Sequence, residues 1–148
     1  MFVIYNFFLS LIIFISPLII LIRIFLGKED QNRFKEKYGF LAKNNNSNEI
    51  VWIHGASVGE ILSIIPIIKK FEKDKKIKRI LITSSTTSSS QILSKFRFKK
   101  TIHQFYPFDL NFLTKHFINH WKPKLAIFVD SEIWPNMFNN LHKKNIPL

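Results

Sequence analysis

The chain has 148 residues, with 22 Lys and Arg against 10 Asp and Glu, and therefore a formal net charge of +12. This length fits one domain of ordinary size, and the absence of cysteine excludes disulfides and thiolate metal sites. The basic excess does not indicate a nucleic-acid-binding protein, because the lysines lie mainly at turns and helix ends and form no recognition motif. A solvated basic face and attraction to an anionic membrane or phosphorylated lipid remain as alternatives.

Residues 1–26 are predicted to form a membrane anchor helix, because the first charged side chain is Arg23 and about 20 apolar residues suffice to cross a bilayer. A secretory signal peptide is disfavoured, since no basic residue precedes the apolar run and no small-residue cleavage site follows it. Pro17 is compatible with a kinked spanning helix and with one that lies in the membrane, so both remain open. The basic residues after position 22 predict that the rest of the chain is cytoplasmic.

Residues 27–48 form a basic and then Asn-rich connector. Within it, residues 33–38 are interpreted either as a short helix on the membrane surface or, preferably, as part of a solvated tether.

Residues 49–148 alternate apolar runs of strand length with stretches of helical periodicity, which predicts an α/β domain with a parallel sheet. Pro66 is expected to bend its helix or shorten the first half. Residues 146–148 are expected to open a fifth strand, which suggests that the domain continues beyond this chain. The predicted strands are 50–53, 79–83, 102–106 and 125–129, and the predicted helices are 60–73, 91–98, 111–121 and one that ends at Leu141.

Parallel α/β sheets bind ligands at the carboxyl ends of their strands, and four polar loops follow the predicted strands here. None of these loops contains Lys or Arg, and none matches a nucleotide-phosphate motif. The hydroxyl-rich loop is predicted to be polar, with the capacity to cap the next helix. The loops are residues 54–60, 83–90, 107–109 and 130–136.

Glu60 allows two interpretations. A glutamate in the first turn of a helix stabilises the helix dipole, and spacing alone favours this structural role. The same carboxylate could act as a general base. His54 and Glu60 lack a third ligand at metal-binding spacing, so a metal site is disfavoured. Asp130 and Glu132 would share one face of an extended segment and could both point into the site.

Taken together, the loops resemble the N-terminal part of the 3-deoxy-D-manno-octulosonic acid (Kdo) transferases, bacterial enzymes that add Kdo to a lipid A precursor. Two signatures at this separation are specific as a pair: Ser57-Val58-Gly59-Glu60 and Glu132-Ile133-Trp134-Pro135-Asn136. The similarity extends from the anchor to the last residue, with further matches at Arg33 through Gly39, Ile65-Pro66, Thr83 through Thr86, and Tyr106-Pro107-Phe108-Asp109-Leu110.

The resemblance implies a fold: the N-terminal Rossmann-like half of a two-domain GT-B glycosyltransferase, preceded by a membrane helix. Residues 49–148 would be an incomplete acceptor-binding domain, and the C-terminal donor-binding domain would be absent. The chain alone would then be inactive. The alternative is a membrane-anchored, noncatalytic α/β module that binds lipid or a partner protein.

The resemblance also implies a reaction. Kdo would move from CMP-Kdo to a lipid A precursor similar to lipid IVA, with inversion and with no metal or cofactor, at the bacterial inner membrane. Glu60 would be the proton acceptor, Asp130 would occupy the position of a family glutamate that stabilises the transition state, and Glu132 would support it. The substrate-binding residues would be Ser57, Gly59, Thr83, Thr86 and Asp109.

Overall fold

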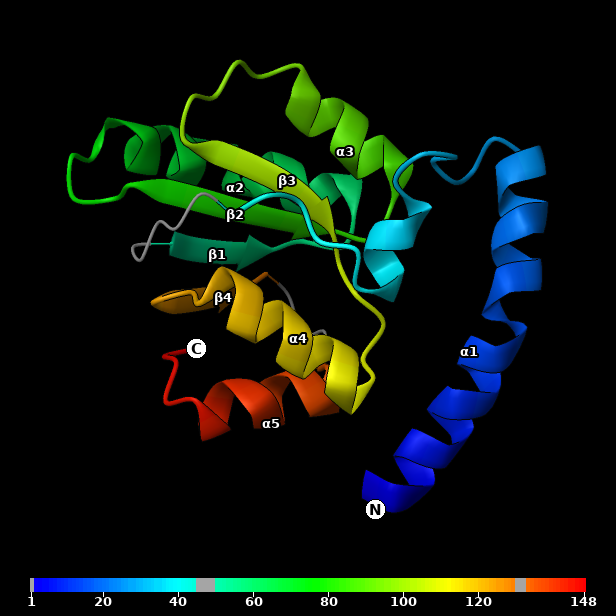
Figure 1. Cartoon of the computed structure of the whole chain (residues 1–148). Coiled ribbons are helices and arrows are strands. Elements are labelled where there is room, and N and C mark those ends of the chain that lie inside the picture. The colour runs from blue at the N-terminus through cyan, green and yellow to red at the C-terminus, as the bar shows by residue number, and fades with distance from the viewer. Residues whose placement is uncertain (1, 45–49, 130–132) are drawn as a thin grey trace.

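The structure, a computed structural model, describes residues 2–44, 50–129 and 133–148 (Figure 1). These residues form a four-stranded, fully parallel sheet in the order β3-β2-β1-β4. Its strands are β1 (Ile50–His54), β2 (Arg79–Ser84), β3 (Thr101–Phe105) and β4 (Leu125–Phe128).

Helices cover both faces of this sheet (Figure 1). Neighbouring side chains of β1 point to opposite faces, as the strand period requires. Trp52 packs with α4 and α5 residues on one face, and Ile53 packs with α2 and α3 residues on the other. The predicted α/β fold with a parallel sheet is thus confirmed. The covering helices are α2 (Val58–Lys73), α3 (Thr87–Ser94), α4 (Asn111–Trp121) and α5 (Pro135–Lys143).

Pro66 lies inside α2 without shortening it, so the expected shortening is wrong, whereas the alternative of a bend stays a prediction. Proline removes the hydrogen bond to the carbonyl four residues earlier, which here belongs to Leu62. Leu62 is exposed, so water can satisfy that carbonyl.

The helix predicted at residues 91–98 begins earlier, at Thr87, and ends at Ser94. The cause is Thr86, whose side chain accepts a hydrogen bond from the backbone N–H of Ser89 at 3.2 Å and starts the helix within the hydroxyl run. Half of the expected polar loop is therefore helical.

The expected fifth strand at residues 146–148 is not formed. The segment instead lies beside β4 through a backbone hydrogen bond from Ala126 N–H to the Pro147 carbonyl, at 2.9 Å.

Residues 33–38 of the connector are packed on the domain, so their interpretation as part of a solvated tether is wrong. The 3-10 helix of the connector, η1 (Phe34–Tyr38), lies at the outer edge of β3. Glu36 accepts the Phe105 backbone N–H at 2.7 Å, and the Gln104 side chain accepts the Ala42 N–H at 3.2 Å. These contacts occupy polar groups of β3 at the edge of the sheet, and that edge would otherwise be free to pair with another strand.

The long helix α1 (Phe2–Phe25) runs along the side of the domain on which the strands end (Figure 1). In the part of the chain that the structure describes, residues Val3–Phe25 are long and apolar enough to cross a membrane.

Candidate functional site

The carboxyl ends of the strands form one connected edge. Backbone hydrogen bonds join each loop to the end of a neighbouring strand, from Gly55 N–H to the Thr83 carbonyl at 3.0 Å and from Val129 N–H to the His54 carbonyl at 2.9 Å. In addition, Ser85 N–H donates to the Ala56 carbonyl of the next loop at 3.3 Å. The loops after β1, β2 and β4 therefore meet, as the parallel sheet predicts.

Glu60 is held at this edge by the start of α2. Ser57 caps the helix by accepting the Glu60 backbone N–H at 3.3 Å. In return, Glu60 accepts the Ser57 hydroxyl at 2.6 Å and the Ala56 N–H at 2.8 Å. This closely resembles a capping box. Each carboxylate oxygen keeps acceptor capacity, so the cap and a base role are compatible.

The two glycines of this loop meet different surroundings. A methyl group on Gly55 would lie 3.3 Å from Glu60 Cβ and 3.4 Å from Ile61 Cδ1. On Gly59 it would approach nothing closer than Ser57 Oγ, at 4.0 Å. Gly55 thus allows Glu60 to approach the loop backbone, whereas Gly59 leaves the exposed start of α2 open.

Thr86 caps the start of α3 in the same way that Ser57 caps the start of α2. The Ser89 hydroxyl, hydrogen-bonded to Thr86 at 2.7 Å, also donates to the Ala56 carbonyl at 3.4 Å. The beginnings of both helices therefore lie side by side, and their positive dipole ends favour a negatively charged group at this edge.

Thr83 lies beneath this surface and is fully buried. Its hydroxyl accepts the Trp52 indole N–H at 2.9 Å and lies 2.9 Å from His54 Nδ1. Burial lowers the pKa of His54 to about 4, so this imidazole is neutral at physiological pH. Direct contact between Thr83 and a substrate stays a prediction.

Asp109 joins three parts of the chain and is 1% exposed. Its Oδ2 accepts the Tyr5 hydroxyl at 2.8 Å and the Asn136 N–H at 2.9 Å, and its Oδ1 accepts the Met137 N–H at 2.8 Å. Burial raises the pKa of this carboxyl, although the three donors oppose the shift. Asp109 thereby caps α5 from another loop, and its predicted role in binding substrate stays a prediction.

Sequence reasoning missed this link between the Pro-Phe-Asp and Trp-Pro-Asn motifs. A signal was present, because Pro135 is well suited to the first turn of a helix whereas Trp134 before it cannot cap with its side chain. A cap supplied by another segment was the remaining possibility.

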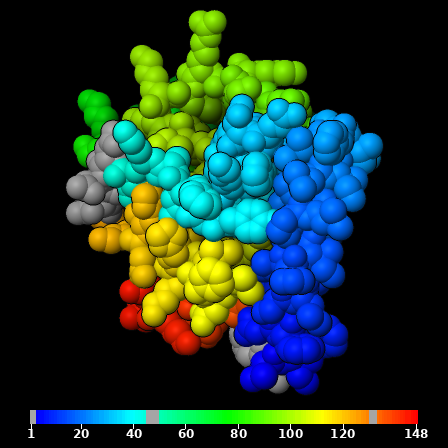
Figure 2. All heavy atoms as spheres, turned by 45° about the vertical axis from the view of Figure 1, so that its right-hand side comes forward, coloured from blue at the N-terminus to red at the C-terminus, as the bar shows by residue number. Residues whose placement is uncertain are grey.

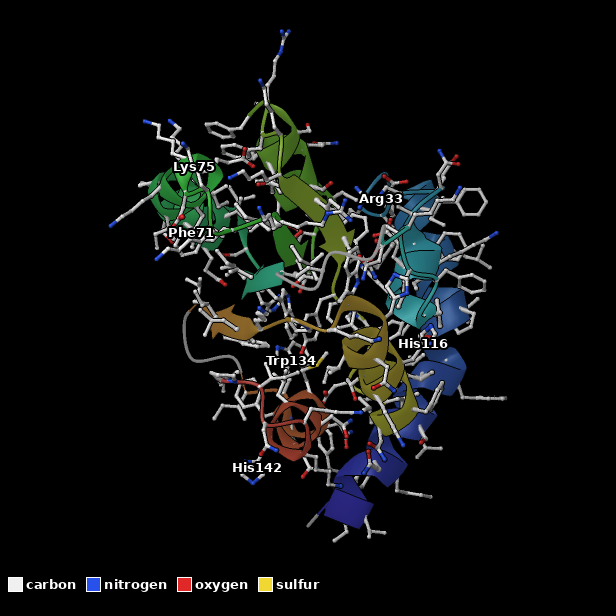
Figure 3. The ribbon with its side chains drawn as sticks, turned by 60° about the vertical axis from the view of Figure 1, so that its left-hand side comes forward. Arg33, Phe71, Lys75, His116, Trp134 and His142 are labelled. Atoms are coloured by element: carbon white, nitrogen blue, oxygen red, sulfur yellow. The ribbon has the colours of Figure 1, made fainter. Side chains whose placement is uncertain are left out.

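Aromatic rings line the core under the edge. The Tyr106 ring centroid lies 4.2 Å from that of His54 and 5.2 Å from that of Trp134. Figure 3 shows Trp134 between β4 and α5, where it packs against the core. The Trp of the second signature is therefore a packing residue at the site.

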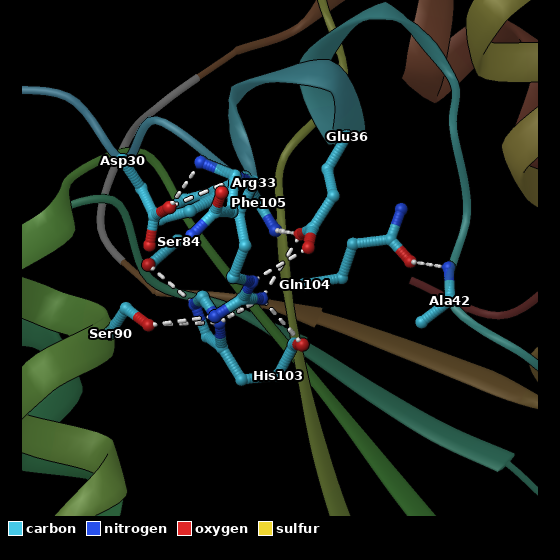
Figure 4. A network of polar contacts seen from close by, with 10 residues as sticks. Asp30, Arg33, Glu36, Ala42, Ser84, Ser90, His103, Gln104 and Phe105 are labelled. Atoms are coloured by element: carbon cyan, nitrogen blue, oxygen red, sulfur yellow. Dashed lines mark hydrogen bonds and ion pairs between the residues drawn. The ribbon is translucent and has the colours of Figure 1, made fainter. Parts of the chain in front are cut away.

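Sequence reasoning also missed a polar network that ties the connector to β3 and α3 (Figure 4). Arg33 pairs with Glu36 at 2.7 Å and donates to the His103 carbonyl, at 2.9 Å, and to Ser90, at 3.1 Å. Because a guanidinium only donates, His103 Nδ1 accepts from it at 2.9 Å, and Nε2–H donates to Ser84 at 2.8 Å. Burial, and then the charge of Arg33, lowers the pKa of His103 to about 3.

Asp130 and Glu132 lie outside the described residues, so their expected roles stay predictions. Among the residues that are described, no group of three or more His, Cys, Asp or Glu side chains could hold a metal ion.

The sheet, its two helical layers and the capped loops define the chain as a parallel α/β domain of the class that binds ligands at the carboxyl ends of its strands. Residues 32–148 match the sequence model of the family described as 3-deoxy-D-manno-octulosonic-acid transferase (kdotransferase). The chain belongs to this family, as the resemblance indicated.

Curated relatives agree with this assignment. The 3-deoxy-D-manno-octulosonic acid transferase of Rickettsia bellii is 39% identical over 140 residues, covering 95% of this chain and 34% of the relative. That of Haemophilus influenzae is 31% identical over 145 residues, with 95% and 34% covered. A bifunctional glycosyltransferase/methyltransferase of Fusobacterium nucleatum is 36% identical over 99 residues, 66% of this chain and 15% of that protein. The chain spans about a third of the length of the Kdo transferases it matches.

Proposed function

We propose that this chain forms the acceptor-side part of a GT-B glycosyltransferase that moves Kdo from CMP-Kdo to a lipid A precursor. The observation that carries the proposal is Glu60, held by hydrogen bonds at the carboxyl edge of the sheet in a chain of the Kdo transferase family.

In this reaction Glu60 is the general base. It accepts the proton of a glucosamine hydroxyl as that oxygen attacks the anomeric carbon of Kdo. The new C–O bond forms while the bond to CMP breaks on the opposite face, so the configuration inverts. Positive charge develops at the anomeric carbon, and we assign its stabilisation to Asp130, supported by Glu132. The mechanism needs no metal.

Substrate positioning is assigned to the capped helix starts. Ser57 and Gly59 lie at the start of α2, beside Glu60, and Thr86 lies at the start of α3. The dipoles of both helices favour the phosphorylated, anionic substrates of this reaction. Thr83 and Asp109 support this surface from below through their buried hydrogen bonds.

The donor nucleotide is proposed to bind mainly to the part of the relatives that lies beyond the match. A chimera tests this division, with residues 1–148 in place of the matching 34% of the Haemophilus influenzae transferase. It should transfer Kdo from CMP-Kdo to lipid IVA, whereas the 148-residue polypeptide alone should not. Both proteins would be assayed in inner-membrane preparations, the location proposed for the enzyme.

A second chimera provides the control, with the Rickettsia bellii segment inserted at the same junction. If that control transfers Kdo and the chimera with this chain does not, although both are folded, the proposed function is wrong. Transfer by the 148-residue polypeptide alone would contradict the assignment of the donor site.

A further inference from the structure

One face of α1 is docked on the domain along most of the helix. The side chains that are buried or half-buried recur every three or four residues, which places them in a single stripe. Between Tyr5 and Ile20 this stripe covers roughly 22 Å of helix axis, at 1.5 Å per residue. Its members include Tyr5, Leu9, Ile13, Ser16, Ile20 and Arg23.

Polar contacts link this stripe to distant parts of the chain. The Tyr5 hydroxyl donates to Asp109 at 2.8 Å, and Asn6 accepts from the Asn136 side chain at 2.7 Å. Further along, the Ser16 hydroxyl is hydrogen-bonded to that of Tyr38 at 2.7 Å. Tyr5 and Asn6 thus find partners on the domain, and Ser16 finds one on the connector.

The opposite face of α1 is exposed and, apart from Ser10, apolar. Val3 is 81% exposed, Phe14 is 87% exposed and Phe25 is 89% exposed. Large apolar side chains are therefore exposed near both ends of the helix and in its middle. Figure 2 shows the helix in blue along one whole side of the molecule, beside the connector. An apolar surface of this length requires a nonaqueous partner.

A helix that crosses a bilayer conflicts with these contacts. If α1 stayed docked, the part of the domain that is bonded to it through Asp109 and Asn136 would be drawn into the hydrocarbon, where polar and charged surface groups are strongly disfavoured. If α1 separated, Tyr5 would lose its acceptor and face lipid. A helix parallel to the membrane surface keeps the polar stripe on the domain and buries only the apolar face.

We propose that α1 lies in the plane of the membrane, docked on the domain, with its exposed face buried in one leaflet that has anionic headgroups. Charge supports this partner, because Glu29 and Glu36 are paired with basic residues of the connector. Lys28, three residues after the end of α1, and Lys35 in η1 remain exposed. The proposal holds whether or not the chain takes part in Kdo transfer.

The docking also sets where the candidate site lies. Because α1 is bonded to Asp109 and to the start of α5, the carboxyl edge of the sheet would open next to the headgroups of that leaflet (Figure 1). A lipid-linked acceptor could then reach the edge without leaving the membrane.

Depth measurements on the full chain test the orientation. The chain has no cysteine, so Val3→Cys, Phe14→Cys and Phe25→Cys each supply one labelling site at an exposed position. With a fluorophore at each site and vesicles of phosphatidylethanolamine and phosphatidylglycerol, spin-labelled lipids should report one similar depth for all three. A spanning helix would instead place Phe14 deepest and Val3 at the far surface, and that profile would overturn the proposal.

Lipid composition tests the partner. The chain should bind phosphatidylcholine vesicles, which lack the anionic lipid, at least about tenfold more weakly than the vesicles that contain phosphatidylglycerol. Equal binding to both vesicles would overturn the anionic preference. A chain that binds neither and forms dimers through α1 would show that a second copy, and not a leaflet, covers this face.

Cross-linking tests whether the docking persists on the membrane. The pair Asn6→Cys with Asn136→Cys should be joined by a short bis-maleimide on vesicles, because the two native side chains are in contact. The pair Phe14→Cys with Asn136→Cys is the matched control, since Phe14 points away from the domain. No difference between the pairs would overturn the docked arrangement.

Discussion

The loop between β1 and α2 contains two glycines that carry different parts of the site. Gly55 lies against Glu60, whereas Gly59 faces open space. The sequence shows both as small residues in a loop. The sequence could not distinguish them, because the difference depends on how the loop packs against the first turn of α2.

Substituting each glycine by alanine should separate these roles. Gly55→Ala should lower the free energy of unfolding by about 1–2 kcal/mol, because the methyl group crowds Glu60 and Ile61. Gly59→Ala should leave that free energy unchanged or raise it, since alanine is the better helix former. Urea unfolding in mild detergent measures both, and equal losses in the two variants would contradict the assigned contacts.

His103 and His54 predict how stability depends on pH. In the folded chain the pKa of His103 is lowered to about 3 and that of His54 to about 4, while an unfolded histidine titrates near 6.5. Below that value the unfolded chain binds more protons, so stability is present at neutral pH and falls as the pH falls. For each histidine, the free energy of unfolding at pH 5 should be lower than at neutral pH by on the order of 2 kcal/mol.

Thermal unfolding between pH 7 and pH 5 checks this dependence. His103→Gln should show a smaller loss of melting temperature across that range than the unsubstituted chain. His116→Gln is the matched control, because His116 lies on the exposed side of α4 (Figure 3). The same pH dependence in the His103 and His116 variants would contradict the role of the buried imidazole.

At the scale of elements, α5 depends on a cap from another loop. Asp109→Asn should lower the free energy of unfolding by about 1–3 kcal/mol, because one of the two backbone donors at the start of α5 would face an amide N–H instead of an oxygen. Asp74→Asn, at an exposed turn, should change it by less than about 0.5 kcal/mol.

The same aspartate should couple α5 to α1. Tyr5→Phe should be more destabilising in the native chain than in the Asp109→Asn background, because the Tyr5 hydroxyl donates to this carboxylate. Additive effects of the two substitutions in chemical unfolding would show that the contact between the helices contributes nothing.

The sequence predicted most strands and helices of the sheet well, because their apolar patterns depend on residues that are close together in the chain. Strands that are buried on both faces consist of continuous apolar runs, and the predicted bounds of β1 and β2 agree with the structure to within one residue. The start of α3 was placed four residues late, because several hydroxyl residues in the run could cap a helix and the sequence alone does not single out Thr86. The docking of η1 on β3 was missed, because its contacts join residues far apart in the chain. Arg33, for example, is bonded to His103, 70 positions away.

The candidate site was predicted unevenly for the same reason. The signature around Glu60 follows directly from the sequence, and its capping partner is only three residues away. The role of Asp109 required the structure, since its partners Tyr5 and Asn136 lie 104 and 27 positions away.

At the scale of the whole molecule, α1, residues 27–44 of the connector and the described part of the α/β domain form one docked unit. Residues 57–60 and 133–136 of the two signatures lie at one edge of the sheet, and α1 runs beside that edge (Figure 1). We propose that this edge is the acceptor side of a Kdo transferase, with Glu60 as its base.

The most direct test is the rate of Kdo transfer by the Haemophilus chimera that carries Glu60→Gln. Glutamine can keep the hydrogen bonds that cap α2 but cannot take a proton, so folding should be preserved while the rate falls about 10²–10⁴-fold. Glu72→Gln, at the other end of α2, is the control and should retain transfer, because Glu72 binds the Lys99 and Lys100 backbone and lies away from the edge. A Glu60→Gln chimera that transfers Kdo within tenfold of the unsubstituted rate would contradict the account.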